Sequence, residues 1–218
     1  MISTNGTIIA FEEFMHSQSL PQLPLLSMNV DEAIFGGMVV SDTDSNMTFC
    51  YPLELGHLVI DMQGERCDIC GSRGCLESLC KTPRLFQALN ERGAMVLAYS
   101  QDFGSDLNTA NMALIKEQLE RGNEKVQAVL QEYAQTLCTA INSIVNLLSV
   151  RSIHISGDIA LLGEPFLTIL RKTFQNNCHP LTGAGHIKLE LFINDYEQVR
   201  LAATIMCLDA IFREQARL

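Results

Sequence analysis

The chain has 218 residues, of which 47% are hydrophobic and 18% are charged. This composition is typical of one α/β domain, or of one large domain with a small lobe, and it excludes a disordered chain and a coiled coil. The formal charge is −10 and no stretch concentrates Lys and Arg on one face, so this chain is not expected to grip the phosphates of a DNA duplex by itself.

The sequence predicts neither a membrane span nor a secretory signal. No apolar run approaches the length needed to cross a bilayer, and the first residues lack the basic segment of a secretory signal. We therefore predict a soluble, cytoplasmic protein with no membrane partner.

The first part of the chain is predicted to be rich in strands. A short helix is expected over residues 7–17, and a polar turn over 41–46 has the chemistry of a hairpin. The predicted strands are Leu25–Val30, Ala33–Val40, Met47–Tyr51 and His57–Asp61.

Helices dominate the second part. The longest begins at Gly122-Asn123, and its apolar residues recur at three- and four-residue steps as far as Leu148. The other predicted helices are 83–93, 109–121, Pro165–Phe174 and Glu197–Arg213, and the predicted strands are Ser152–Ser156 and Ile187–Ile193. This alternation predicts an α/β fold, a mixed sheet flanked by helices on its faces.

Three of the eight cysteines, Cys67, Cys70 and Cys75, lie within nine residues, and His57 precedes them. Thiolates and imidazole suit tetrahedral zinc, and a complete set of four ligands makes the metal structural. The alternatives are reduced core cysteines with a chance histidine, or a redox Cys-x-x-Cys, which a following glycine disfavours. The other cysteines are predicted to be small core residues: Cys50, Cys80, Cys138, Cys178 and Cys207.

The run Glu54-Leu55-Gly56-His57, followed by a cysteine knuckle that ends in Gly74-Cys75-Leu76-Glu77, resembles the zinc motif of the ROK (repressor, ORF, kinase) family. The family motif usually has one residue between its first two cysteines, whereas Cys67 and Cys70 are separated by two. The resemblance spans nearly the whole chain. It implies the C-terminal lobe of an actin-like ATPase (ribonuclease H-like) fold, with a zinc knuckle over 54–77.

Three segments of this resemblance depart from the family's kinases. Gly6 stands where their catalytic aspartate is expected, Val30-Asp31-Glu32 replaces the Gly-Thr-Gly phosphate loop, and Asp158 replaces the second glycine of the segment Ile153–Leu167. Without the aspartate no group accepts the proton of a sugar hydroxyl, and carboxylates beside phosphates cost Coulomb energy. The resemblance therefore implies a chain that is not an enzyme.

By the same resemblance, Asn5, Glu54, His57 and Glu77 match positions that hydrogen-bond a hexose. Carboxylates and an imidazole suit a polyol, because each can accept or share bonds with neighbouring hydroxyls. The alternative is that Glu54 and Glu77 are surface carboxylates or groups that orient the histidine.

The resemblance is to sugar-responsive regulators of the N-acetylglucosamine- and xylose-repressor type. It implies that residues 1–218 are the effector-binding and oligomerisation portion, which takes a sugar or sugar phosphate and forms a homo-oligomer (dimer or tetramer). DNA binding is expected only through a winged-helix domain outside this chain. The first lobe of the actin-like fold is also expected to lie outside it. The alternatives are a divergent ROK sugar kinase that phosphorylates a hexose with ATP, and an interaction domain without a small ligand.

Overall fold

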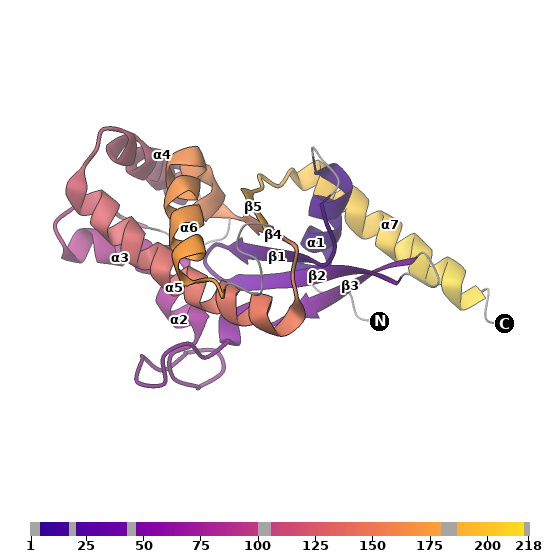
Figure 1. Cartoon of the computed structure of the whole chain (residues 1–218). Helices are drawn as coiled ribbons and strands as arrows, with labels where there is room; N and C mark the ends of the chain where they lie inside the picture. The colour runs from indigo at the N-terminus through magenta and orange to yellow at the C-terminus, as the bar shows by residue number, and fades with distance from the viewer. Residues whose placement is uncertain (1–4, 18–20, 43–46, 100–105, 180–186, 216–218) are drawn as a thin grey trace.

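A computed structural model describes residues 5–17, 21–42, 47–99, 106–179 and 187–215 (Figure 1). Its core is a five-stranded sheet in the order β3-β2-β1-β4-β5. The first three strands are antiparallel, and β4 and β5 each run parallel to the preceding strand of the sheet, β1 and β4. The strands are β1 Leu25–Val30, β2 Ile34–Asp42, β3 Met47–Leu53, β4 Ser152–Ser156 and β5 Lys188–Leu191. This confirms the predicted mixed sheet.

Helices cover both faces of this sheet (Figure 1). The bounds are α1 Asn5–His16, α2 Leu76–Cys80, α3 Thr82–Glu91, α4 Asp106–Glu120, α5 Glu124–Leu148, α6 Gly163–Asn177 and α7 Tyr196–Gln215. Every residue of the central strand β1 is buried. Leu26, Met28 and Val30 join the large core with α5 and α6, whereas Leu25 packs with Ala10 of α1 on the opposite face, as the alternation of side chains along a strand requires.

Six of the helices, α1 and α3 to α7, correspond to predicted ones, but the segment after β3 does not. Leu55–His57 forms a 3-10 helix, η1, and Val59 makes only an isolated bridge with Cys75, so the predicted strand His57–Asp61 is wrong. The chain turns here because it must double back toward the knuckle, where the N–H groups of Ile60 and Asp61 both donate to the carbonyl of Gly74. The short α2 and a second 3-10 helix, η2 (Asp158–Leu162), were not predicted.

The start of α1 lies unusually close to β2. A Cβ atom on Gly6 would overlap the carbonyl oxygen of Gly36, and one on Gly37 would come within 2.6 Å of the carbonyl oxygen of Gly6. The helix can approach the strand this closely only because neither backbone carries a side chain at the contact. Any residue larger than glycine at position 6 must push the two elements apart.

The long helix α5 packs along α6 and against α2, α3 and α4. Asn123 caps its first turn by accepting hydrogen bonds from the N–H groups of Lys125 and Val126 at 3.1 and 3.3 Å, which satisfies donors that have no partner inside the helix. The hydroxyl of Tyr133, in the middle of α5, donates to the carbonyl of Cys80 at the end of α2. The helix is therefore attached directly to the segment that leaves the knuckle.

A buried cluster of ionisable groups lies between α1 and the parallel strands. His154 of β4 is 1% exposed, and its two ring nitrogens lie 3.5 Å from Glu13 Oε2 and 3.7 Å from Glu190 Oε2. Phe192 stacks on the ring, with the centroids 5.5 Å apart. Removing one member of such a buried group leaves an unpaired charge or dipole, so the cluster ties α1 to β4 and β5.

Among the described residues, no helix is both long enough and apolar enough to cross a membrane.

Candidate metal centre and neighbouring polar site

The knuckle is a loop whose glycines hold its two arms together. Gly71 and Gly74 have φ angles of +76° and +65°, which side-chain-bearing residues rarely adopt, and a Cβ on Gly74 would overlap the carbonyl oxygen of Asp61. The N–H of Cys67 donates to the carbonyl of Ser72 at 2.7 Å. These contacts return Cys75 to the level of Cys67, as the sequence pattern predicted.

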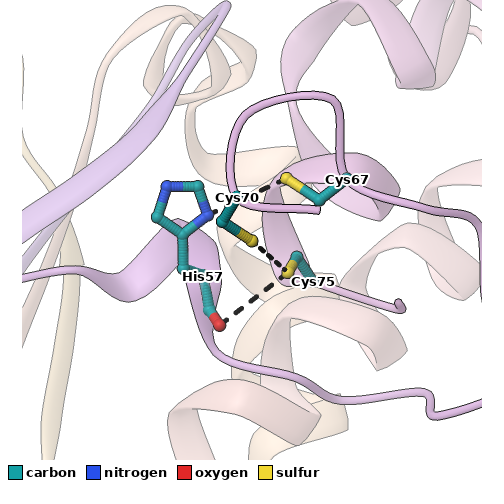
Figure 2. A group of neighbouring side chains, drawn as sticks. All are labelled: His57, Cys67, Cys70 and Cys75. Atoms are coloured by element: carbon teal, nitrogen blue, oxygen red, sulfur yellow. Dashed lines mark hydrogen bonds between the residues drawn. The ribbon is translucent and has the colours of Figure 1, made fainter. Parts of the chain in front are cut away.

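The four predicted ligands converge on one point (Figure 2). The ligand atoms of His57, Cys67, Cys70 and Cys75 all lie within 4.8 Å of one another. Cys70 Sγ is 3.5 Å from Cys75 Sγ, and Cys67 Sγ is 3.8 Å from His57 Nδ1. Zinc–sulfur bonds of about 2.3 Å place tetrahedral ligands roughly 3.5–3.8 Å apart. The described cluster therefore has the donor set and the spacing to hold a metal ion.

Two of the thiols differ in how easily they lose a proton. The N–H of Ser72, together with Cys75, lowers the pKa of the exposed Cys70 thiol to about 6, whereas burial raises the pKa of Cys75 to about 12. A bound divalent cation would displace the protons of both, because thiolates are the ligands. The buried thiol gains the most from a metal, since its own charge is otherwise poorly solvated.

The predicted sugar-contacting residues lie around η1 and the start of α2. Glu54 precedes η1 and is exposed, His57 ends η1 and is half-buried, and Glu77 is the second residue of α2 and is 4% exposed. Asn5 is exposed at the start of α1, the helix whose next residue packs on Gly36 of β2. The N–H of His57 donates to the carbonyl of Glu54 at 3.1 Å, and His57 lies near enough to the Glu77 carboxyl to lower its pKa, so these three residues are neighbours.

Glu77 is also a structural carboxylate. Its Oε2 accepts the N–H of Ile34 at 2.6 Å, and a Cβ on Gly56 would come within 2.6 Å of the same oxygen. Burial raises the pKa of the Glu77 carboxyl above its ordinary value, although the N–H of Ile34 and the nearby Lys81 and His57 act in the opposite direction. One carboxylate oxygen thus holds β2 to α2, and the histidine lies beside it.

Three acidic residues meet at the carboxyl ends of β1 and β4. Asp31 Oδ1 accepts the N–H of Asp158, and Glu32 Oε1 accepts the Nδ2–H of Asn108 at 2.6 Å. Burial first, and then the charges of Asp31 and Glu32, raise the pKa of Asp158 from its ordinary value to about 7. The sequence predicted acidic groups at these positions, but not that Asp31 would bond to the backbone of Asp158.

The raised pKa of Asp158 makes stability depend on pH. Because the folded state holds this proton more tightly than the unfolded state, the stabilisation is fully present below about pH 4 and is lost as the pH rises through about 7. Asp158→Asn should remove this dependence and raise the free energy of unfolding at pH 8 by roughly 1–2 kcal/mol, after allowing for solvent screening. Urea unfolding at pH 5 and pH 8 measures it, with Glu120→Gln, on the surface of α4, as the control. An equal pH dependence in wild type and Asp158→Asn would contradict the prediction.

A family model described as "ROK family" matches residues 48–188, which include the whole knuckle and most of the sheet's helical cover. The chain belongs to the ROK family. The resemblance seen in the sequence is therefore confirmed. Kanosamine kinase from Amycolatopsis mediterranei (strain S699) is 27% identical over 137 residues, which are 62% of this chain and 40% of that protein.

Solved ROK structures share the fold. The ROK hexokinase from Thermus thermophilus matches with a TM-score of 0.68 at 19% identity, over 93% of this chain and 65% of that one. The Streptomyces griseus ROK glucokinase in complex with glucose and AMPPNP matches with a TM-score of 0.66 at 17% identity, over 88% of this chain and 62% of that one. A ROK transcriptional regulator, a homologue of the E. coli MLC protein, matches with a TM-score of 0.65 at 21% identity, over 91% of this chain and 48% of that one.

This ROK chain spans from less than half to about two thirds of the length of these relatives. Two parts of the fold prediction are confirmed: the mixed sheet flanked by helices, and the likeness to the actin-like fold of ROK proteins. The assignment of residues 1–218 to one effector-binding domain stays a prediction, as do the sugar-contacting residues. Sequence reasoning missed the buried His154 cluster, because Glu13 and Glu190 are far from that histidine in the sequence.

Proposed function

We propose that this chain is the effector-binding and oligomerisation portion of a ROK-type, sugar-responsive transcriptional regulator without kinase activity. The observation that supports the proposal is the contact between Gly6 and Gly36, which leaves no space for a side chain at the position where the resemblance places a kinase's general base. The similarity to a ROK transcriptional regulator supports the class of protein.

The knuckle would bind a structural zinc ion. Three sulfurs and one imidazole nitrogen complete a tetrahedral set, so no position remains open for a water nucleophile. His57 has its Nδ1 toward Cys67 (Figure 2), so the other ring nitrogen is left to donate to a ligand hydroxyl. In this arrangement the metal fixes the ring, and the ring together with Glu54 and Glu77 positions a hexose or hexose phosphate.

The regulator would act as a cytoplasmic homo-oligomer whose copies meet through the long helices. DNA contact would come from a separate winged-helix domain, because the acidic charge of this chain opposes binding to phosphates. Pairing two copies would present two such domains to the two half-sites of an operator.

A second candidate function is a divergent sugar kinase. It is favoured by the 27% identity to kanosamine kinase and by the shared fold with a ROK hexokinase and a ROK glucokinase. In that case the general base must come from a residue other than the one at position 6.

One experiment separates the two functions. The purified chain is titrated with a panel of hexoses, amino-hexoses and their 6-phosphates, and its melting temperature is followed with and without Mg-ATP, while ADP release is measured in parallel. We expect one sugar to raise the melting temperature, by mass action on the folded state, and ADP release to stay at background. Sugar-dependent ADP release would instead establish the kinase. The role of His57 is tested with two variants. The sugar-induced rise in melting temperature should be lost in His57→Gln and kept in His179→Gln, the matched control on the surface.

A further inference from the structure

The carboxyl ends of β1 and β4 form the place where the connections of the sheet diverge. The chain leaves β1 toward β2 on one side, and it leaves β4 through η2 and α6 toward β5 on the other side. Open sheets with parallel strands bind ligands in the crevice outside such a point, because no connection crosses it. The contents of this crevice therefore decide whether a ligand can enter.

In this chain the side chain of Asp31 occupies that position. Its Oδ1 accepts the backbone N–H of Asp158, and its Oδ2 accepts the Nδ2–H of Asn29 at 2.8 Å. Asn29 is in turn bonded from β4, since the Ser156 hydroxyl donates to Asn29 Oδ1 at 3.4 Å. Both carboxylate oxygens thus have protein donors, one in β1 and one just after β4.

The backbone is shaped to allow this contact. Gly157 has a φ of +84°, and a Cβ there would lie 2.5 Å from Asp31 Oδ1 and 2.7 Å from the carbonyl oxygen of Val30. Only glycine lets the amide of the next residue approach the carboxylate. A backbone N–H after such a turn commonly binds an anion. Here the N–H of Asp158 binds the carboxylate of Asp31 instead.

The turn that carries Asp31 is fixed from other elements as well. The N–H of Thr82, in α3, donates to the Asp31 carbonyl at 2.7 Å, and Glu32 is bonded to Asn108 of α4. Since the side chain and the backbone of Asp31 are both fastened, the carboxylate cannot swing out without breaking several bonds.

We propose that Asp31 is an autoinhibitory internal ligand: its carboxylate closes the crevice between β1 and β4 and keeps phosphorylated ligands out of it. We call the contact of Asp31 with Asp158 and Asn29 the Asp31 latch. The latch goes beyond the proposed regulatory function and stands whether or not the protein controls transcription. Glu32 and, above about pH 7, Asp158 reinforce it, because their charges lie at the same edge and repel an incoming phosphate.

The first test is amide hydrogen exchange followed by NMR. In the wild-type chain the Asp158 amide should be protected although it lies outside the β4 ladder, and Asp31→Ala should speed its exchange at least tenfold, while the amides of the β1–β4 ladder keep their protection and so report an intact fold. Asp195→Ala, which removes an exposed carboxylate that bonds the N–H of Glu197, is the matched control and should leave the Asp158 amide unchanged. An Asp158 amide that exchanges equally fast in wild type and Asp31→Ala would overturn the latch.

The second test uses inorganic pyrophosphate and a variant that removes all three charges, Asp31→Ala with Glu32→Gln and Asp158→Asn. Pyrophosphate should leave the amide resonance of residue 158 unmoved in the wild type and shift it in the triple variant. A shift in the wild type would show that the crevice is open, and no shift in a folded triple variant would show that Asp31 excludes nothing. Either result overturns the autoinhibitory role, and neither depends on sugar binding or DNA binding.

Discussion

Cys75→Ser is expected to abolish metal binding and to lower the free energy of unfolding by on the order of 5 kcal/mol. Cys75 is fully buried and caps the start of α2, and its Sγ lies 3.5 Å from Cys70 Sγ, so a serine leaves an incomplete ligand set inside the fold. Structural zinc contributes about 10 kcal/mol or more of apparent binding free energy in small metal-dependent domains, and this chain also has a large core of its own. The loss should therefore be several kcal/mol rather than complete unfolding.

The measurements are elemental analysis of protein purified without added metal, and urea unfolding of the wild type and the variant. Cys207→Ser is the matched control, because that cysteine is exposed on α7 and lies outside the cluster. About one zinc per chain should be present in the wild type and in Cys207→Ser, and none in Cys75→Ser. Metal-free wild-type protein with freely reactive thiols would reduce the knuckle to ordinary cysteines and would remove the zinc from the proposed function.

Gly6→Asp is expected to destabilise the fold by about 3 kcal/mol or more and to give no kinase activity. The new Cβ would overlap the Gly36 carbonyl, so α1 must move away from β2 and the packing of Ala10 and Leu25 beneath it must change. Because α1 must shift to admit the new side chain, the carboxylate of the Gly6→Asp variant would not take the position that a general base needs.

Asn5→Asp provides the control for this variant. It adds the same carboxylate one residue earlier, at an exposed position in the first turn of α1, where a negative charge suits the helix dipole. Thermal unfolding should separate the two variants clearly, and ADP release with a hexose panel measures activity. A Gly6→Asp protein that melts like the wild type and phosphorylates a sugar would support the kinase instead.

The sequence predicted what depends on local pattern. Helix α5 follows from the spacing of its apolar residues and the polar Asn123 before it, and the metal cluster follows from close cysteines with flanking glycines. The 3-10 helix η1 was missed because its form depends on Gly56, which packs against the carbonyl of Ile34, a contact that no local pattern encodes.

Contacts between distant residues account for the rest of the site. The bond from Ile34 to Glu77 and the bond from Asp158 to Asp31 join side chains to backbone groups that are brought together only by the sheet order. Residue types at these positions could be read from the sequence, but their partners could not. The same holds for His154, which a single sequence shows only as an isolated histidine within an apolar strand.

The hydrogen bond from Tyr133 to Cys80 fastens α5 to the end of α2, the short helix that leaves the knuckle. Glu77 lies one turn before Cys80 in the same short helix, so a displacement of α2 by a ligand at Glu77 would reach this contact. From Tyr133 to the exposed Leu147 the helix is about 21 Å long at 1.5 Å per residue. A tilt of roughly 5° about this contact would carry Leu147 through about 2 Å, and in the proposed oligomer such a shift would change how the long helices of two copies fit together.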